Sequence, residues 1–288
     1  MQPISKITSA QAAGIRYVLM DIDDTLTLQG KLLASSFTAL WKLKAAGLKV
    51  IPVTGRPAGW CDCIARQWPV DGIIGENGAL AFWEEPLVSV ESGAAGPGTI
   101  KDHRLPSLKT MFHTNAVRND HPALKRVRER ALTEVPGIRD AKDQFARLFD
   151  IAFDFAEEEP VLSLKEAQRV KAIALEEGAE AKISSIHVNV WMGDYNKLSM
   201  TERFLQNVFG WHLGDLQNGS CRDDHSVLFI GDSPNDEPMF ARFPLACGVA
   251  NINRYGTMLQ HLPAFVSQKE SGEGFTEITE VLLAKRSR

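Results

Sequence analysis

The sequence predicts an α/β protein: a Rossmann-like core with a parallel sheet, and a smaller inserted α+β unit. Short apolar segments alternate with segments of helical periodicity, and chains of this kind form right-handed crossovers around a parallel sheet. The alternation occupies the first and last thirds of the 288 residues and changes character between them. We therefore expect a core from residues 1–85 and 192–288, with residues 86–191 as the insert.

The composition is that of an ordinary globular protein, with 44% hydrophobic and 24% charged residues. The net charge of -4 argues against a nucleic acid or an anionic membrane as partner. Cys61 and Cys63 lack a second Cys/His pair at zinc-site spacing, so reduced thiols are expected. No leader-like start and no membrane-length apolar run is present, which predicts a cytoplasmic location. The sequence carries no signal of an oligomeric state.

The first third contains the clearest elements. Strands are expected at 16–21 and 48–53, helices at 35–47 and 56–68, and a strand, a turn at Asn77-Gly78 and a hairpin arm within 70–83. The last third repeats this pattern. Helices are expected at 198–210, 235–243 and 275–285, and strands at 226–232 and 244–251.

The middle of the chain is less regular. A loop is expected at 91–98, and helices at 121–137 and 163–178. Residues 148–156 and 182–192 alternate between apolar and polar side chains. This alternation predicts strands in a sheet with one face open to solvent or to a ligand.

Three of the predicted core strands end in polar residues. The sequences that follow them are DIDDT from Asp21, VTGRP from Val53, and GDSPND from Gly231. In open α/β sheets, ligands bind beyond the carboxyl ends of the strands, where these segments would converge. Each motif alone also suits an ordinary loop or capped turn, but their order, each after an apolar strand, favours a joint site.

A cluster of carboxylates without His or Cys predicts a hard cation, and Mg²⁺ is the best match. We expect Asp21, Asp23, Asp232 and Asp236 in this cluster, with Thr54 and Ser233 nearby. A carboxylate can act as a covalent nucleophile, and a second acid two residues later can act as general acid and then base. Hydroxyl and backbone N–H donors would hold phosphoryl oxygens, and a lysine would neutralise their charge.

These motifs make the sequence similar to the haloacid dehalogenase superfamily of phosphohydrolases. DIDDTL resembles the first motif of that superfamily, VTGR the second, Lys197 the third and GDSPND the fourth. GENGA (75–79) and the position of the insert resemble the large-cap subclass IIB, which includes sugar-phosphate phosphatases and phosphomannomutase. In that subclass the insert is a cap that determines substrate specificity.

The resemblance implies a role for each matched residue. Asp21 is the nucleophile that forms a phospho-aspartate, and Asp23 protonates the leaving oxygen and then activates water. Carboxylate oxygens of Asp21 and Asp232 and the carbonyl of Asp23 would bind Mg²⁺, and Asp236 would support the metal through water or hydrogen bonds. Other residues expected to bind the phosphoryl group or line the substrate site are Thr54, Gly55, Lys197, Ser233 and Asn235.

The acid at Asp23 favours an ester substrate, because an alkoxide leaving group needs a proton and an anhydride does not. In the insert, His187 and Asn189 share one face of an expected strand and could bind sugar hydroxyls, although a solvent-facing strand would show the same pattern. Arg56 could contact substrate or form a structural ion pair. Asp24 is expected to cap the turn after the working pair.

Three functions follow from these features. The leading prediction is a Mg²⁺-dependent phosphomonoester hydrolase acting on a small phosphorylated metabolite, in particular a sugar phosphate. The second is a phosphohexomutase using the same aspartates. The third is a non-catalytic regulator that binds a phosphorylated metabolite, although such a binder has no need of both Asp21 and Asp23.

Overall fold

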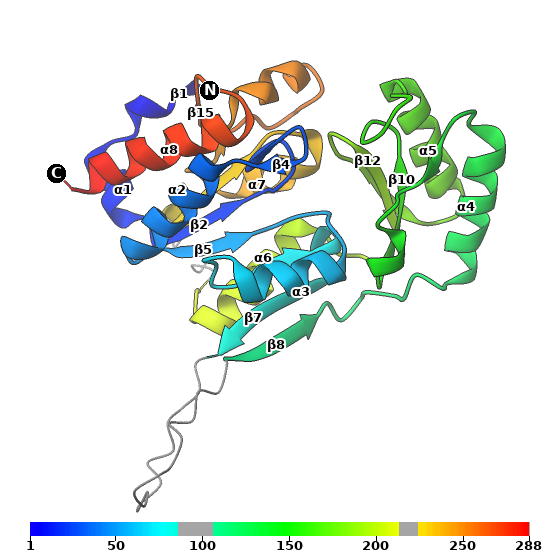
Figure 1. The fold of residues 1–288 in the computed structure, drawn as a ribbon, viewed down its shortest axis with the longest axis horizontal. Helices are drawn as coiled ribbons and strands as arrows, with labels where there is room; N and C mark the ends of the chain where they lie inside the picture. The colour runs from blue at the N-terminus through cyan, green and yellow to red at the C-terminus, as the bar shows by residue number, and fades with distance from the viewer. Residues whose placement is uncertain (86–105, 213–223, 288) are drawn as a thin grey trace, which may run out of the picture.

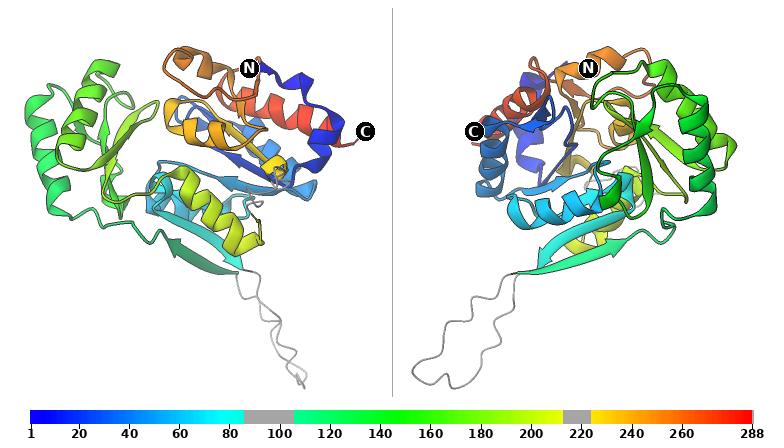
Figure 2. Two further views of the ribbon diagram at one scale, coloured as in Figure 1. Left: turned by 180° about the vertical axis from the view of Figure 1, so that it is seen from behind. Right: turned by 45° about the vertical axis from the view of Figure 1, so that its right-hand side comes forward.

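The protein, represented by a computed structural model, has two parts (Figure 1). The structure describes residues 1–85, 106–212 and 224–287. The larger part is a parallel sheet between layers of helices, and the smaller part is an antiparallel sheet with two helices on one face (Figures 1 and 2). The predicted fold class is confirmed.

The elements of residues 1–112 are β1 (Gln2–Pro3), η1 (Ile4–Lys6), α1 (Ser9–Gly14), β2 (Tyr17–Met20), β3 (Thr27–Leu28), β4 (Lys31–Leu32), α2 (Ala34–Ala45), β5 (Lys49–Pro52), α3 (Ala58–Gln67), β6 (Ile73–Gly75), η2 (Glu76–Gly78), β7 (Leu80–Glu85) and β8 (Ser107–Phe112). Those of the smaller part are α4 (Pro122–Glu134), β9 (Arg139–Asp140), η3 (Gln144–Ala146), β10 (Asp150–Asp154), α5 (Leu164–Glu176), β11 (Glu180–Ile183) and β12 (His187–Trp191). The rest are α6 (Lys197–Phe209), η5 (Asp224–Ser226), β13 (Val227–Gly231), η6 (Pro234–Asp236), α7 (Glu237–Arg242), β14 (Cys247–Gly248), η7 (Ala250–Tyr255), β15 (Phe265–Val266) and α8 (Ser271–Arg286).

The main sheet has the strand order β1-β15-β14-β13-β2-β5, and all of its described pairings are parallel. At its centre, Leu19 of β2 lies opposite Phe229 of β13 and Ile51 of β5. One face packs against α1, α2 and α8, and the other against α6 and α7. The completely apolar β2 and β13 are therefore covered on both faces, as parallel strands require.

A small antiparallel sheet, β6-β7-β8, continues from the edge of the main sheet through a parallel bridge between Val53 and Ile74. It contains the hairpin expected within 70–83, with its turn at η2. Strand β8 lies inside the expected insert, residues 86–191, yet pairs along its whole length with β7. The division into residues 1–85 with 192–288 and residues 86–191 stays a prediction.

The smaller part has the strand order β11-β12-β10-β9. Its helices α4 and α5 cover the sheet face that points away from the larger part, so the other sheet face lies toward it (Figure 2). The alternative of a face open to solvent is wrong for β10 and β12, because every residue of these two strands is buried. The alternation reflects an apolar face under helices and a polar face toward the larger part.

Other differences concern element length. The strand expected at 182–192 is a hairpin, with β11 and β12 on either side of a turn at 184–186. The strand expected at 244–251 shortens to β14, because η7 begins at Ala250. The loop expected at 91–98 lies outside the described residues. Within the described ranges, none of the helices has the length and apolarity that a membrane crossing demands.

Candidate active site

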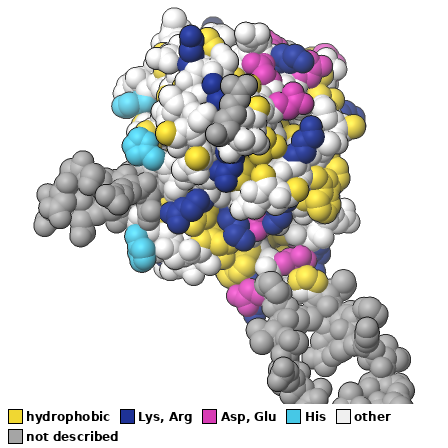
Figure 3. All heavy atoms as spheres, turned by 90° about the vertical axis from the view of Figure 1, so that its left-hand side faces the viewer, with side chains coloured by type: hydrophobic (Ala, Val, Ile, Leu, Met, Phe, Trp, Pro, Cys, Tyr) yellow, Lys and Arg dark blue, Asp and Glu magenta, His cyan; other side chains and the backbone are white. Residues whose placement is uncertain are grey.

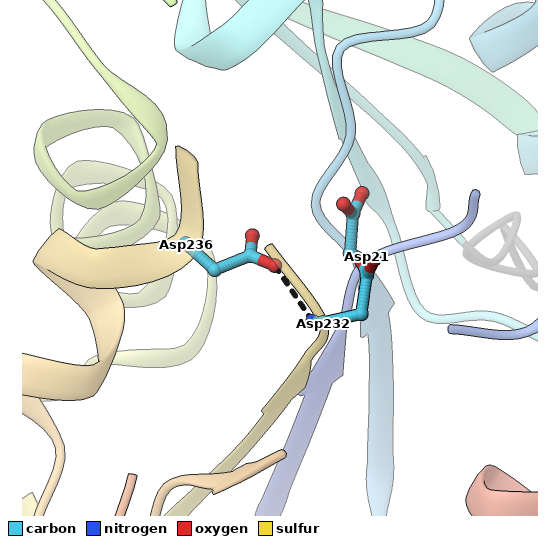
Figure 4. Close-up of side chains that lie close together, drawn as sticks. All are labelled: Asp21, Asp232 and Asp236. Carbon is cyan, nitrogen blue, oxygen red and sulfur yellow. Dashed lines mark hydrogen bonds between the residues drawn. The ribbon is translucent and has the colours of Figure 1, made fainter. Parts of the chain in front are cut away.

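Three buried aspartates meet at the carboxyl ends of β2 and β13. Asp21 directly follows β2, Asp232 directly follows the neighbouring β13, and Asp236 comes from η6 (Figure 4). One carboxylate oxygen from each lies within 4.8 Å of those of the other two. The parallel pairing of β2 with β13 brings the DIDDT and GDSPND segments together, as the sequence predicts.

Lys197 is the one cation that contacts this cluster among the described residues. Its Nζ lies 3.0 Å from Asp21 Oδ2 and 2.8 Å from Asp236 Oδ1, and its side chain is 2% exposed. Lys197 begins α6, which is capped by Asn196. The η2 turn packs against this start: a Cβ on Gly78 (φ +107°) would lie 2.2 Å from the Asn196 carbonyl oxygen. Only glycine fits there, so the GENG segment helps to place Lys197.

Polar neighbours restrain the remaining oxygens of the cluster. Asp236 Oδ2 accepts the backbone N–H of Asp232 at 3.1 Å. Asp232 accepts the Thr25 hydroxyl at 3.2 Å and the Asn251 side-chain amide at 3.2 Å. Both oxygens of Asp236 are therefore occupied by donors of this chain, which suits a supporting position more than a direct contact to a cation.

The cluster carries an excess of negative charge. Burial raises the pKa of Asp21 to about 7, Lys197 opposes this rise, and the charge of Asp236 adds to it. Burial and then Asp236 and Asp21 raise the pKa of Asp232. Burial lowers the pKa of Lys197, but Asp21 and Asp236 outweigh this effect and raise it overall. Three carboxylates with one ammonium favour an additional cation.

Asp23 lies apart from the three clustered aspartates and pairs with Arg56. Arg56 Nε donates to one Asp23 oxygen at 2.8 Å, and Nη2 donates to the other at 2.9 Å. Arg56 also contacts Glu157 and Asp143 of the smaller part. The alternative of a substrate contact or an ion pair, left open by the sequence, is thus an ion pair in this structure.

The remaining residues of the VTGR segment surround this pair. Thr54 is fully buried, and its hydroxyl oxygen accepts the N–H of Arg56 at 3.1 Å. A Cβ on Gly55 would lie 3.2–3.3 Å from the side chains of Asn77 and Asn189. The Asn77 amide nitrogen has no hydrogen-bond partner within the described part of the chain.

The GDSPND segment holds its own polar side chains close together. The Ser233 hydroxyl donates to Asn235 Oδ1 at 2.8 Å, and both residues are buried. The Ser233 N–H is 3.5 Å from Asp236 Oδ2. Ser233 and Asn235 therefore lie beside the aspartate cluster, within the turn that supplies Asp232 and Asp236.

His187 and Asn189 lie on the polar face of β12 and contact acids of the smaller part. His187 Nε2 is 2.9 Å from Glu157 Oε2, and Asn189 Nδ2 donates to Asp150 Oδ2 at 2.9 Å. Both are buried, so the alternative of a solvent-facing strand is wrong. In this structure the His187 side chain contacts Glu157, and the Asn189 side chain donates a hydrogen bond to Asp150.

Sequence reasoning missed several residues that hold the two parts together. Glu76 accepts backbone N–H groups from Ala58 and, in the smaller part, from Leu148, Phe149 and Asp150. The buried Arg147 donates to the Gly55 carbonyl at 3.0 Å. GENGA was a signal for Glu76, whereas the partners of Arg147 and Arg56 had none.

A cleft of about 680 Å³ reaches Asp23 and Arg56 from the boundary between the parts. Trp60, Glu157, Glu159 and Ser185 are among its lining residues. A second hollow, of about 500 Å³, lies near the amino end of β5, where its Lys44 and Lys49 both pair with Asp71. On the face away from the smaller part, basic, acidic and hydrophobic side chains are interspersed (Figure 3). Of these two hollows, the first includes residues of the expected site, and Asn235 lines a further hollow beside Tyr255.

Part of this chain and its fold are similar to known proteins. Residues 18–91 match the model of a family described as haloacid dehalogenase-like hydrolase. A protein of Thermoplasma acidophilum has a similar structure, with TM-score 0.63, 18% identity, and coverage of 93% of this chain and 98% of that one. A comparison with curated proteins finds no significant match.

Two further structures carry functional names. One is described as a subclass IIB sugar phosphatase of the haloacid dehalogenase superfamily, with TM-score 0.57, 14% identity and coverage of 92% and 98%. The other is the sucrose-phosphatase of Synechocystis in complex with sucrose and phosphate, with TM-score 0.56, 13% identity and coverage of 92% and 97%. At these identities the likeness is one of fold.

The chain shares its fold with proteins described as haloacid dehalogenase-like. The segment that carries Asp21, Asp23 and Thr54 lies within residues 18–91, which match the model of the haloacid dehalogenase-like hydrolases. The predicted resemblance is confirmed.

Proposed function

We propose that this chain is a Mg²⁺-dependent phosphomonoester hydrolase that acts on a small phosphorylated metabolite, a sugar phosphate, through a phospho-aspartate at Asp21. The observation that carries the proposal is the contact of Lys197 with Asp21 and Asp236, beside Asp232, at the carboxyl ends of parallel strands. The fold that this chain shares with a sugar phosphatase and a sucrose-phosphatase supports a sugar phosphate as substrate.

The residues present fit Mg²⁺. The donor set is entirely oxygen, which is the preference of this ion, and the three carboxylates exceed the charge of Lys197 by two. Asp21 and Asp232 would hold the ion, with Asp236 restraining Lys197 and the backbone of Asp232. When bound, the ion would lower the negative charge around the phosphoryl oxygens and the attacking carboxylate.

The chain's own residues can then divide the reaction. The Asp21 carboxylate attacks phosphorus, while the bond from phosphorus to the leaving oxygen breaks and Asp23 gives that oxygen a proton. Water next attacks the phosphorylated Asp21, the Asp23 carboxylate takes a proton from it, and inorganic phosphate leaves. Lys197 holds Asp21 through the 3.0 Å contact and offsets the charge of the transferring group.

The second part of the molecule is proposed as a cap that contributes to substrate choice. It lies over the cleft that reaches Asp23, and residues of both parts line this cleft. Contact between the parts would shield the reacting groups from bulk water. Under this proposal residues 86–191 form the cap, with β8 packed on the core hairpin.

A phosphate-release screen tests the proposed function. Purified protein is incubated with sugar phosphates, phosphoglycerate derivatives and nucleotides, with Mg²⁺ or with EDTA. We expect release from at least one sugar phosphate with Mg²⁺ and loss of release with EDTA. Binding without release would favour the regulator, and interconversion of hexose phosphates without release, given an activating bisphosphate, would favour the mutase.

A further inference from the structure

Arg56 connects Asp23 of the core to two acids of the smaller part. Its side chain is 4% exposed, and it makes a two-pronged contact with Asp23 through Nε and Nη2. Nη2 also donates to Glu157 Oε1 at 2.8 Å, and Nη1 donates to Asp143 Oδ2 at 3.3 Å. The guanidinium lies 4.4 Å from the centre of the Trp60 ring. Every described polar contact of this side chain is thus with a carboxylate, and two of the three carboxylates belong to the smaller part.

The two acids of the smaller part are themselves held in place. Glu157 contacts His187, which lies on β12, at 2.9 Å. This hydrogen bond and the charge of Arg56 lower the pKa of Glu157 to about 2, against the effect of burial. Asp143 accepts hydrogen bonds from two nitrogens of the buried Arg147, Nε and Nη2. The position of Arg56 is therefore set by groups that do not touch the reacting atoms.

We propose, on the basis of the proposed hydrolase function, that Arg56 is a positioning residue for Asp23, and that Glu157 and Asp143 fix Arg56 when the two parts are in contact. The planar guanidinium fixes both the position and the plane of the Asp23 carboxylate, which a lysine could not do. Closure of the smaller part would then complete the proton-transfer site as well as cover it.

The competing role for Arg56 is direct substrate binding. A substrate phosphoryl group at Arg56 would have to displace Asp23, Glu157 or Asp143, because the described donors all point at these carboxylates. The two roles affect different kinetic quantities. A substrate contact changes KM for every substrate. Misplacement of Asp23 lowers kcat/KM only for leaving groups that need a proton, because kcat/KM covers the steps up to the phospho-aspartate and not the later attack of water.

The experiment compares two substrates that differ in this need. Cleavage of ribose 5-phosphate releases an alkoxide, which requires a proton. Cleavage of p-nitrophenyl phosphate releases a phenolate, which does not. We expect Glu157→Ala and Arg56→Lys to lower kcat/KM for ribose 5-phosphate by about ten-fold, which is a part of the roughly 10²–10⁴-fold that general acid catalysis contributes. For p-nitrophenyl phosphate, kcat/KM should change by less than about two-fold, since Asp23 has little role in its departure.

Glu180→Ala is the matched control, because Glu180 is an exposed acid of the smaller part that neither lines the cleft nor contacts Arg56 among the described residues. It should leave both rates unchanged. Asp23→Asn gives the upper limit of the selective loss. Glu157 is on the surface, so its variant should fold even if a substitution of the buried Arg56 does not.

Three results would overturn the proposal. Equal losses on the two substrates in Glu157→Ala would assign Arg56 to substrate binding, and unchanged rates on both would show that Asp23 is positioned without it. A crystal structure of Glu157→Ala that keeps the contact of Arg56 with both Asp23 oxygens would also contradict it. A wild-type protein that releases phosphate from no substrate would instead refute the proposed function itself.

Discussion

Replacement of Lys197 by methionine tests whether the aspartate cluster is held together by one buried cation. Methionine keeps most of the apolar stem and removes the ammonium, which lies 3.0 Å from Asp21 and 2.8 Å from Asp236. At an effective dielectric constant of about 20, each contact corresponds to about 5 to 6 kcal/mol of Coulomb attraction. Most of this is offset by desolvation, and loss of one partner of a buried ion pair costs about 3–5 kcal/mol.

We therefore expect the free energy of unfolding of Lys197→Met to fall by about 3–5 kcal/mol in EDTA. Added Mg²⁺ should restore part of the loss, because a cation bound by Asp21 and Asp232 relieves the same repulsion. Urea unfolding, followed by tryptophan fluorescence and circular dichroism, measures both effects.

Lys44→Met provides the control. Lys44 lies 2.7 Å from Asp71, a similar distance, but its side chain is 30% exposed. Its loss should cost no more than about 1 kcal/mol, as for other surface ion pairs. If Lys197→Met and Lys44→Met have the same small cost, or if Mg²⁺ does not stabilise Lys197→Met, the reasoning about the cluster is refuted.

Three more predictions follow from the same contacts. Glu76→Ala leaves four backbone N–H groups without their acceptor, three of them buried, and should lower the unfolding free energy by at least about 3 kcal/mol. Glu85→Ala, at an exposed ion pair, should be close to neutral in the same urea titration. Gly78→Ala should displace Lys197 and abolish phosphate release, while Gly47→Ala, also at positive φ but with open space around it, should cost only about 1–2 kcal/mol and keep activity. Folding raises the pKa of Asp21 from 3.8 to about 7. In EDTA, the contribution of this carboxyl group to the free energy of unfolding should therefore be complete below pH 3.8 and be lost as the pH rises through 7. Asp21→Asn should remove this part of the pH dependence of urea unfolding.

The clustered aspartates could be predicted from sequence because the geometry of a parallel sheet brings the ends of its strands together. Asp21 and Asp232 each follow an apolar strand, and the carboxyl ends of neighbouring parallel strands meet at one edge. Lys197 could be placed as well, since it follows the insert and begins a helix with a clear cap. Local sequence therefore contains most of the information needed for this half of the site.

The contacts between the two parts could not be predicted in this way. Arg56 meets Asp143 and Glu157 across 87 and 101 residues of chain, and nothing in the sequence near either acid marks it as a partner. The polar positions of β12 were ambiguous for a different reason. His187 and Asn189 alternate with apolar residues as they would on a solvent-facing strand, but a second part of the protein covers them. Periodicity shows that two faces differ and not what each face contacts.

The shortest strands could not be predicted from the sequence either. Strands β1 and β15 extend the main sheet with two residues each and are too short to show a period. The helix expected at 275–285 begins earlier, at Ser271, and includes Gly272 and Gly274. A Cβ at either glycine would collide with neighbouring atoms. Glycine at these positions serves close packing, although its low helix propensity suggests a loop.

The central claim is that Asp21 is the nucleophile of a phosphohydrolase. The most direct test measures phosphate release with Mg²⁺ by the wild-type protein, Asp21→Asn and Asp24→Asn, on the best substrate of the screen. Asp24 has a φ of +53°, which asparagine tolerates well, and its side chain hydrogen-bonds to Ser185 outside the cluster. We predict that Asp21→Asn loses at least about 10³-fold in kcat, as expected for a missing covalent nucleophile, while Asp24→Asn stays within about ten-fold of the wild type. Near-normal phosphate release by a folded Asp21→Asn protein would contradict the account.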